Sequence, residues 1–194
     1  MSVKSLYIGI DPSQMKSGSS SYGCIVGIID KEIVFTIRLS QEPFDIFTEL
    51  EVNIAQYSNM NYNVYVAIEQ INPAGSSMFS KSCSGDSKLF AGYKTLSLML
   101  DILEDTYSIT TKHSIPLTWM KKLGLEPKKI TLDEKYSLLV KQKKMTESKA
   151  KREYRKKILI PKIVTEEIEF NGFKLTKPMF DGAAIAYYAS LHFK

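Results

Sequence analysis

Short apolar runs separated by polar turns characterise the N-terminal part of the chain. Residues 6–10, 24–29 and 33–39 are rich in β-branched and other apolar side chains, so each run predicts a strand. Asp30 and Lys31 form a tight, hairpin-like link between the second and third runs. Three successive strands with short links predict an antiparallel meander.

After the meander, the pattern changes to alternating helices and strands. Residues 44–54 carry apolar side chains at helical spacing, namely Phe44, Phe47, Leu50 and Ile54, with Pro43 suited to the first turn. Residues 64–69 form a nearly uninterrupted apolar run, which is typical of a strand buried in the middle of a sheet. An amphipathic helix over residues 89–103 and a strand over residues 108–115 follow.

The C-terminal part of the chain predicts three helices. Residues 118–123 have helical spacing and end near Gly124, which suits a helix C-terminus. Thr131 and Glu134 form the pattern of a capping box, so a helix is expected to begin there and run into a lysine-rich segment. A final helix, rich in Ala and Tyr, is expected over residues 180–192.

This order of elements predicts the fold class. Three hairpin-linked strands followed by strand–helix alternation indicate an α/β protein with one mixed five-stranded sheet and helices on both faces. No internal repeat or clean boundary divides the sequence, so residues 1–194 are expected to form a single domain. Within it, a basic helical segment is expected at about residues 131–160.

Composition narrows the class of protein. Apolar residues make up 44% and charged residues 24% of the chain, which is the balance of a soluble globular protein. Cys24 and Cys83 form no Cys-x-x-Cys pair, and with only His113 and His192 beside them a structural zinc site is not expected. We find no signal-peptide pattern and no run of about 20 apolar residues, so a cytoplasmic protein without membrane contact is expected.

Positive charge is concentrated in one segment. The net charge is +5, yet residues 141–157 contain nine Lys or Arg and two Glu, so this segment carries +7 and the remainder −2. A local basic segment is typical of nucleic-acid binding, although a solvated helix face gives the same pattern. The residues expected to contact DNA here are Lys149, Lys151, Arg152, Arg155 and Lys156.

Three acidic residues stand at the ends of apolar elements. Asp11 follows the first strand, Glu69 ends the central strand, and Asp181 begins the last helix. Burial and like-charged neighbours both disfavour ionised carboxylates, so three acids together need a compensating cation, and carboxylate oxygens suit Mg²⁺ or Mn²⁺. Taken singly, each acid has an ordinary alternative as a turn residue, a strand-edge charge or a helix N-terminal charge.

Such a site supports hydrolysis of phosphodiesters by two metal ions. One ion lowers the pKa of the attacking water and the other stabilises the leaving oxygen, with the ions about 4 Å apart. This chemistry needs neither a histidine nor a serine nucleophile. It therefore fits a chain with two histidines and no nucleophile elbow.

Three short motifs occur in a characteristic order along the chain. They are Ile-Gly-Ile-Asp-Pro-Ser at residues 8–13, Ala-Ile-Glu-Gln at 67–70 and Asp-Gly-Ala-Ala-Ile-Ala at 181–186. The set resembles the motifs of the RuvC family of Holliday junction resolvases, in the RNase H-like superfamily. Residues 90–93 and 115–125 are similar to segments of phage-type members. Each motif alone is unspecific, but the ordered set spans almost the whole chain.

The resemblance implies an RNase H-like fold and the activity of a crossover junction endodeoxyribonuclease. Such an enzyme cuts four-way DNA junctions with Mg²⁺, for which Mn²⁺ substitutes, using two ions per site and leaving 5′-phosphate and 3′-hydroxyl ends. Asp11, Glu69 and Asp181 would be both the catalytic residues and the metal ligands.

The resemblance also implies basic and apolar contacts to DNA around the acids. Lys121 and Lys122 are the expected catalytic lysines, since a cation near the scissile phosphate stabilises developing charge, and Lys135 is expected to contact DNA. Met78 and Phe79, in the loop after the second motif, are expected to contact bases at the crossover. Packing of Phe79 on the core is the alternative.

One position departs from the family pattern. Many members carry an acid or a histidine one helical turn before the last aspartate, where this chain has Pro178. Either three carboxylates suffice, or another residue such as Asp86 completes the metal shell.

The two-fold symmetry of a four-way junction implies a homodimer. The helix with Leu89, Leu96 and Leu103 offers an interface, unless these residues pack on their own sheet. No small-molecule cofactor is expected, and a viral source would place the protein in the host cytoplasm. Three alternatives stay open: a branched-DNA-binding protein without cleavage, an RNase H-like nuclease for RNA–DNA hybrids or flaps, and an ATP-binding protein of the actin and sugar-kinase type, for which the chain is short.

Overall fold

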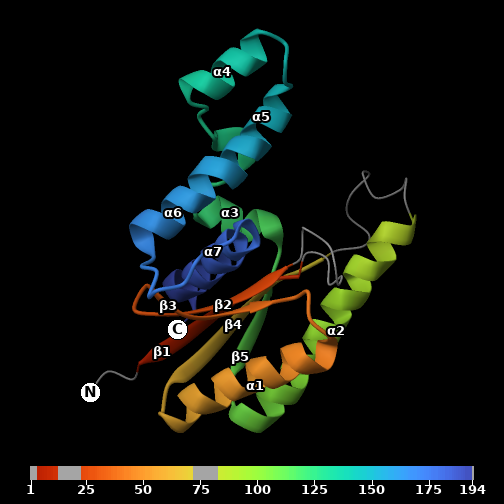
Figure 1. Cartoon of the computed structure of the whole chain (residues 1–194), viewed down its shortest axis with the longest axis vertical. Coiled ribbons are helices and arrows are strands. Elements are labelled where there is room, and N and C mark those ends of the chain that lie inside the picture. Colours follow the sequence, from red (N-terminus) through yellow and green to blue (C-terminus); the bar gives the residue numbers. More distant parts are fainter. Residues whose placement is uncertain (1–3, 13–22, 72–82, 194) are drawn as a thin grey trace.

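The computed structural model describes residues 4–12, 23–71 and 83–193. One five-stranded sheet, in the order β3-β2-β1-β4-β5, forms the centre of the protein (Figure 1). The strands are β1 (Ser5–Asp11), β2 (Cys24–Ile29), β3 (Glu32–Arg38), β4 (Asn63–Glu69) and β5 (Thr110–Ser114). The predicted mixed sheet is confirmed, because β1, β2 and β3 are antiparallel whereas β4 pairs in parallel with β1 and β5.

A two-residue turn links β2 and β3, as predicted. Asp30 and Lys31 both have positive φ, 48° and 71°, which is the backbone of a hairpin turn whose twist matches that of the flanking strands. The turn places Ile28 opposite Ile33. Pairing of β2 with both β1 and β3 then completes the antiparallel half of the sheet.

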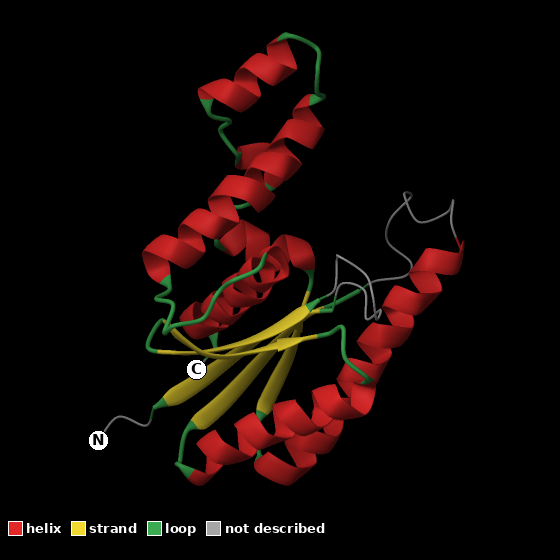
Figure 2. Cartoon of the chain, viewed as in Figure 1, coloured by secondary structure: helices red, strands yellow, loops and turns green. Residues whose placement is uncertain are grey.

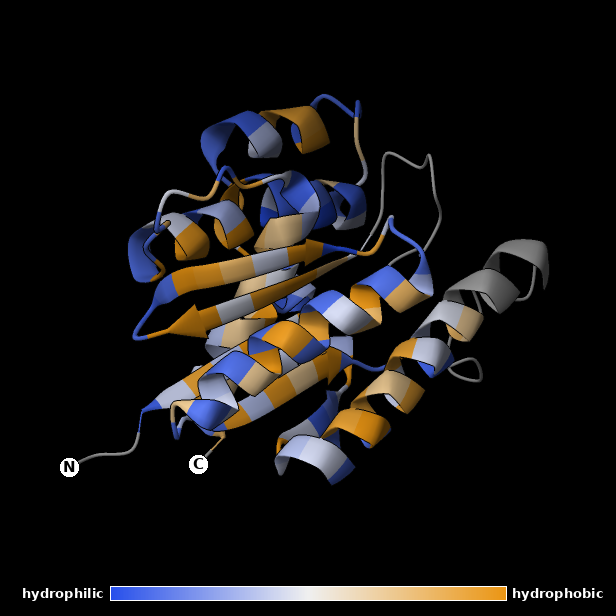
Figure 3. Cartoon of the chain, turned by 60° about the horizontal axis from the view of Figure 1, so that its bottom comes forward, coloured by the Kyte–Doolittle hydropathy of each residue, from blue (hydrophilic) through white to orange (hydrophobic). Residues whose placement is uncertain are grey.

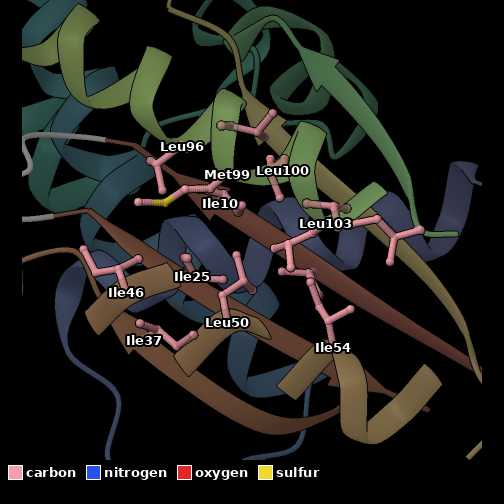
Figure 4. Close-up of a cluster of buried hydrophobic side chains, with 14 of the residues drawn as sticks. Ile10, Ile25, Ile37, Ile46, Leu50, Ile54, Leu96, Met99, Leu100 and Leu103 are labelled. Atoms are coloured by element: carbon pink, nitrogen blue, oxygen red, sulfur yellow. The ribbon is translucent and has the colours of Figure 1, made fainter. Parts of the chain in front are cut away.

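Two helices cover one face of the sheet (Figure 2). They are α1 (Pro43–Asn59) and α2 (Cys83–Tyr107), and both confirm the helices expected from apolar spacing. Their buried sides and alternate residues of the strands form one hydrophobic core. Figure 4 shows part of this core, including Ile10, Ile25, Ile37, Ile46, Leu50, Ile54, Leu96, Met99, Leu100 and Leu103.

The buried side of α1 differs at one end from the predicted stripe. Leu50 and Ile54 are buried as expected, but Phe44 is 76% exposed. Ile46, one turn before Leu50, takes the buried position instead. The prediction for Phe44 is therefore wrong.

Three helices lie on the opposite face of the sheet. They are α3 (Pro116–Lys122), α6 (Ile160–Glu167) and α7 (Lys177–His192). Of these, α7 packs directly on β1, because a methyl group at Gly9 would run into the backbone of Gly182 and Ala186. This close approach fixes the height of α7 above β1, and with it the position of the adjacent Asp181.

A helical arm projects from the body of the protein (Figure 1). We define the arm as η2 (Pro127–Lys129), α4 (Glu134–Lys141), α5 (Glu147–Tyr154) and η3 (Arg155–Leu159). The π-helical turn η3 joins α5 to α6 without a break, so the arm is continuous with a helix of the body. The rings of Tyr136 and Tyr154, with centroids 5.4 Å apart, pack α4 against α5.

The arm corrects two expectations about the basic segment. The helix does not begin at Thr131: α4 begins at Glu134, because the Asp133 side chain accepts a hydrogen bond from the Tyr136 backbone N–H and caps the first turn. The segment is also divided, since α5 begins separately after its own cap residue, Thr146. The basic residues therefore belong to successive helices and not to one.

Hydropathy follows the layers of the fold. Figure 3 shows hydrophobic residues gathered on the strands and on one side of the covering helices. The α/β class is confirmed, with helices on both faces of the sheet.

None of the helices in the described segments combines the length and the apolar composition needed to cross a bilayer.

Candidate active site

Parallel pairing brings the ends of β1 and β4 together. Ile10 lies opposite Ile68 in the register of these strands, so the next residues, Asp11 and Glu69, are neighbours at one edge of the sheet. Each acid closes a buried apolar strand, as the sequence indicates. The sheet therefore fixes two of the three predicted acids beside each other.

Asp181 reaches the same edge from α7. It precedes Gly182, whose backbone packs against β1, and its charge acts on Glu69. Asp181 lies in the second turn of α7, which begins at Lys177, and not at the helix start as predicted. The helix begins one turn before Asp181, with Pro178 in its first turn, because proline is well suited to the first positions of a helix.

Burial and two neighbouring acids change the ionisation of Glu69. Asp11 is only 7% exposed, and the side chain of Asp181 only 17%. Burial, followed by the negative charges of Asp11 and Asp181, raises the pKa of Glu69 to about 8. Glu69 therefore holds its proton to a higher pH than an ordinary glutamate.

This donor set suits a hard divalent cation. Three carboxylates supply oxygen ligands, and a cation among them would offset the repulsion that raises the Glu69 pKa. Within residues 4–12, 23–71 and 83–193, however, no three Asp, Glu, His or Cys side chains are gathered closely enough to form a ready metal cluster.

A tryptophan that the sequence did not single out contacts the site. Trp119 of α3 is fully buried, and its indole Nε1 donates a hydrogen bond to Glu69 Oε2 over 3.3 Å. This bond favours the ionised carboxyl and so lowers the Glu69 pKa, against the larger effect of burial. The signal in the sequence was slight: Trp119 is the single tryptophan of the chain.

Two consecutive basic residues of η3 reach the acids. Lys156 Nζ donates to Asp181 Oδ2 over 3.2 Å. Arg155 is only 8% exposed, and although burial lowers its pKa, attraction by Asp181 and Glu69 opposes that effect. Both residues were expected as DNA contacts. The structure pairs Lys156 with Asp181 and places Arg155 within the electrostatic influence of Asp181 and Glu69.

Arg155 is held in place by a second helix. Its Nη1 donates to Met120 Sδ of α3 over 3.0 Å, and its Nε is buried with no partner in the part of the chain that the structure describes. Arg155 is the first residue of η3, and π-helical turns are frequent at functional sites. The site thus contains a buried guanidinium as well as the half-exposed Lys156 amine.

The other predicted DNA contacts lie along the arm. Lys149 and Arg152 of α5 and Lys135 of α4 are exposed. Lys151 is partly buried and pairs with Glu147 over 2.7 Å. Their positions agree with a basic surface that leads away from the acids, and their role in binding stays a prediction.

The predicted catalytic lysines belong to α3. Lys121 and Lys122 are exposed in its last turn, whereas the cation that pairs with Asp181 is Lys156 of η3. Their catalytic role stays a prediction. Met78 and Phe79, and the side chain of Asp86, lie outside the described residues.

A buried thiol lies next to Asp11 without the properties of a nucleophile. Cys24 faces Asp11 in the β1–β2 register and is fully buried. Burial, and then the charge of Asp11, raises the pKa of Cys24 to about 12. Because the thiolate is the reactive form, Cys24 is inert near neutral pH.

Three acids at one sheet edge, a tryptophan hydrogen bond and two cations from the arm thus make up the site. Comparison of the sequence with protein-family models yields no match, and comparison with curated proteins yields none either. The chemistry of the site is therefore inferred from its own residues and their geometry.

Proposed function

We propose that the protein is a Mg²⁺-dependent endonuclease that cuts branched DNA, with four-way junctions as its substrate. The observation that carries the proposal is the convergence of Asp11, Glu69 and Asp181, where burial, followed by the charges of Asp11 and Asp181, raises the pKa of Glu69 to about 8. Carboxylates in such an arrangement are suited to hold divalent cations. The order of antiparallel and parallel strands supports an RNase H-like fold for this site.

In this proposal Asp11, Glu69 and Asp181 are the metal ligands. Two Mg²⁺ ions bound there would supply an activated water and stabilise charge on the leaving 3′ oxygen. The contribution of the chain itself is positional. The ends of β1 and β4 hold Asp11 and Glu69 side by side, and the close packing of α7 holds Asp181.

The cations at the root of the arm would serve the substrate. A phosphate that approaches Asp181 also approaches Lys156 and Arg155. Positive charge at that point stabilises the negative charge that develops on the phosphate during the reaction. The exposed Lys149 and Arg152 would extend contact along the DNA backbone, which makes binding strongly salt-dependent.

A homodimer with two sites would suit paired cuts across a junction. Leu96 and Leu103, expected for an interface, are buried in the protein's own core, which is the alternative given for them, and the side chain of Leu89 lies outside the described residues. The same helix exposes Leu98 and Ile102, which are 62% and 48% exposed. This side of α2 supports the proposal of a dimer surface.

The direct test is incubation of the full chain with a synthetic four-way junction and Mg²⁺ or Mn²⁺. We expect cuts that leave 5′-phosphate and 3′-hydroxyl ends. Asp11→Asn, Glu69→Gln and Asp181→Asn should each lower the rate by about 100-fold or more, while junction binding in EDTA is retained. Glu49→Gln, which removes an exposed carboxylate of α1, is the matched control and should cut at the wild-type rate.

The outcomes separate the proposal from its alternatives. Preference for a flap or an RNA–DNA hybrid over the junction would indicate a different nuclease specificity. Tight junction binding without cutting in either metal would indicate a binding protein. An acid variant that retains near wild-type rate is not a metal ligand, and absence of cleavage of every substrate in both metals overturns the proposed activity.

A further inference from the structure

A basic cavity opens where the arm meets α7. Its volume is about 380 Å³, and it is lined by Arg152, Glu153, Lys156, Lys157 and Lys177. These residues come from α5, η3 and the first turn of α7. Because two distant parts of the chain supply the lysines, the concentration of charge is a property of the fold and not only of the basic segment. We call this cavity the arm-root pocket.

Two of its cations already have partners. Lys157 Nζ pairs with Glu153 Oε2 over 3.2 Å. Lys156 Nζ pairs with Asp181 Oδ2, also over 3.2 Å, and so faces the acids while lining the pocket. Lys156 is therefore shared between the two places.

The other two cations leave the pocket with unbalanced positive charge. Neither Arg152 nor Lys177 forms an ion pair with any residue that the structure describes. The charge of Arg152 also acts unfavourably on the buried Arg155 nearby. Like charges that line one cavity repel each other, and an anion bound between them would offset that repulsion.

The pocket and the acids are contiguous. Lys177 precedes Asp181 by four residues on α7, so the two side chains lie on the same side of the helix, one turn apart. Lys156 bridges from the pocket to Asp181. An anion in the pocket would thus lie next to a group bound at the carboxylates.

We propose that the arm-root pocket binds one phosphate of a nucleic-acid backbone, next to the phosphodiester attacked at the acids. Arg152 and Lys177 hold this phosphate, and Lys156 turns to it from Asp181. The turn frees a carboxylate oxygen of Asp181 for a divalent cation, so backbone and cation strengthen each other's binding. This inference rests on the proposed function, because it assumes DNA as the substrate of the neighbouring site.

Binding of DNA in EDTA tests the pocket without any cleavage. Arg152→Gln/Lys177→Gln is compared with Lys162→Gln/Lys174→Gln, which removes the same charge from exposed residues outside the pocket. Fluorescence anisotropy with a labelled four-way junction should give about 10-fold weaker binding for the first variant. Its plot of log affinity against log salt should be shallower by about 1, with little change for the second. Equal losses of junction affinity in both variants would overturn the assignment of a phosphate subsite to the arm-root pocket.

Inorganic phosphate distinguishes a backbone site from a site for the free anion. We expect millimolar phosphate to change the melting temperature of the wild-type protein only slightly. The two variants should then differ in their affinity for DNA. A large phosphate-induced shift that the Arg152→Gln/Lys177→Gln variant loses, with DNA affinity unchanged, would overturn the assignment to nucleic acid.

Lys156→Gln tests the shared role through two opposite effects. Without DNA, the variant should require about threefold less Mg²⁺ to reach half of its thermal stabilisation, because a cation that competes at Asp181 is gone. In EDTA it should bind the junction about threefold more weakly. Lys162→Gln should change neither value, and unchanged or weaker Mg²⁺ binding in Lys156→Gln would overturn the exchange. All these readouts are independent of cutting, so their failure is distinct from failure of the proposed nuclease activity.

Discussion

Trp119 Nε1 lies 3.3 Å from Glu69 Oε2, and this hydrogen bond joins the buried face of α3 to the acid that ends β4. It opposes the burial and the neighbouring charges that raise the pKa of Glu69 to about 8. The indole thus favours the ionised carboxyl, which is the form that ligates a cation. Trp119 therefore tunes the acid as well as filling the core.

Replacing Trp119 by Phe keeps a buried ring and removes the N–H donor. We expect the pKa of Glu69 to rise further, because a hydrogen bond to the carboxylate favours its ionised form. The free energy of unfolding should fall by about 1 kcal/mol. NMR titration of side-chain carboxyl carbons in Mg²⁺-free buffer measures the pKa, with the exposed Glu49 as internal reference. A Glu69 pKa that stays constant or falls would contradict this role of the indole.

Glu69 should make the stability of the protein depend on pH. The pKa of Glu69 is about 8 in the folded protein, whereas an unperturbed glutamate, as in the unfolded chain, has a pKa of 4.5. Between these values the folded chain holds a proton that the unfolded chain releases. The free energy of unfolding therefore falls as the pH rises through this window, by up to about 1.4 kcal/mol per pH unit. Glu69→Gln should flatten the decline. Urea unfolding across the window checks this, and parallel declines in both proteins would assign the effect to other groups.

Mg²⁺ should stabilise the folded protein through the three acids. A cation that binds only the folded state at 100 times its dissociation constant adds about 2.7 kcal/mol. The rise in melting temperature should be larger at about pH 8 than at about pH 6, because Glu69 must lose its proton to bind. Asp11→Asn should reduce the rise, whereas the exposed-site variant Glu49→Gln should retain it. An equal rise in all proteins, or in sodium chloride of the same ionic strength, would indicate general screening instead.

Hydrophobic periodicity predicted the elements that place the acids. Apolar runs end at Asp11 and Glu69, and parallel pairing of neighbouring strands then brings their ends to one edge without further information. The local sequence pattern did not decide between two nearby residues that could each fill the same structural position. Asp133 caps α4 in place of Thr131, and Ile46 replaces Phe44 in the core, because each pair offers nearly the same local chemistry.

The cations at the site could not be assigned from the sequence. Arg155 and Lys156 stand in a long basic run, and the sequence alone does not distinguish them from its other Lys and Arg residues. What distinguishes them is the packing of η3 beside α3 and α7, which buries Arg155 and joins Lys156 to Asp181. Trp119 was missed for the same reason, since its contact with the acids exists only after α3 has docked.

Gly9 tests whether the packing of α7 on β1 holds the site together. A methyl group there would meet the backbone of Gly182 and Ala186, and backbone cannot rotate aside as a side chain does, so α7 must move. We expect Gly9→Ala to lower the free energy of unfolding by about 3 kcal/mol. By displacing Asp181, the substitution should also slow cleavage by the protein that remains folded. Gly172→Ala is the control, because its φ of 78° costs only about 1 kcal/mol of backbone strain and no atom lies within 4 Å of the added methyl. Equal losses on urea unfolding would mean that this contact is not what positions α7, and that Asp181 is held at the sheet edge by other contacts.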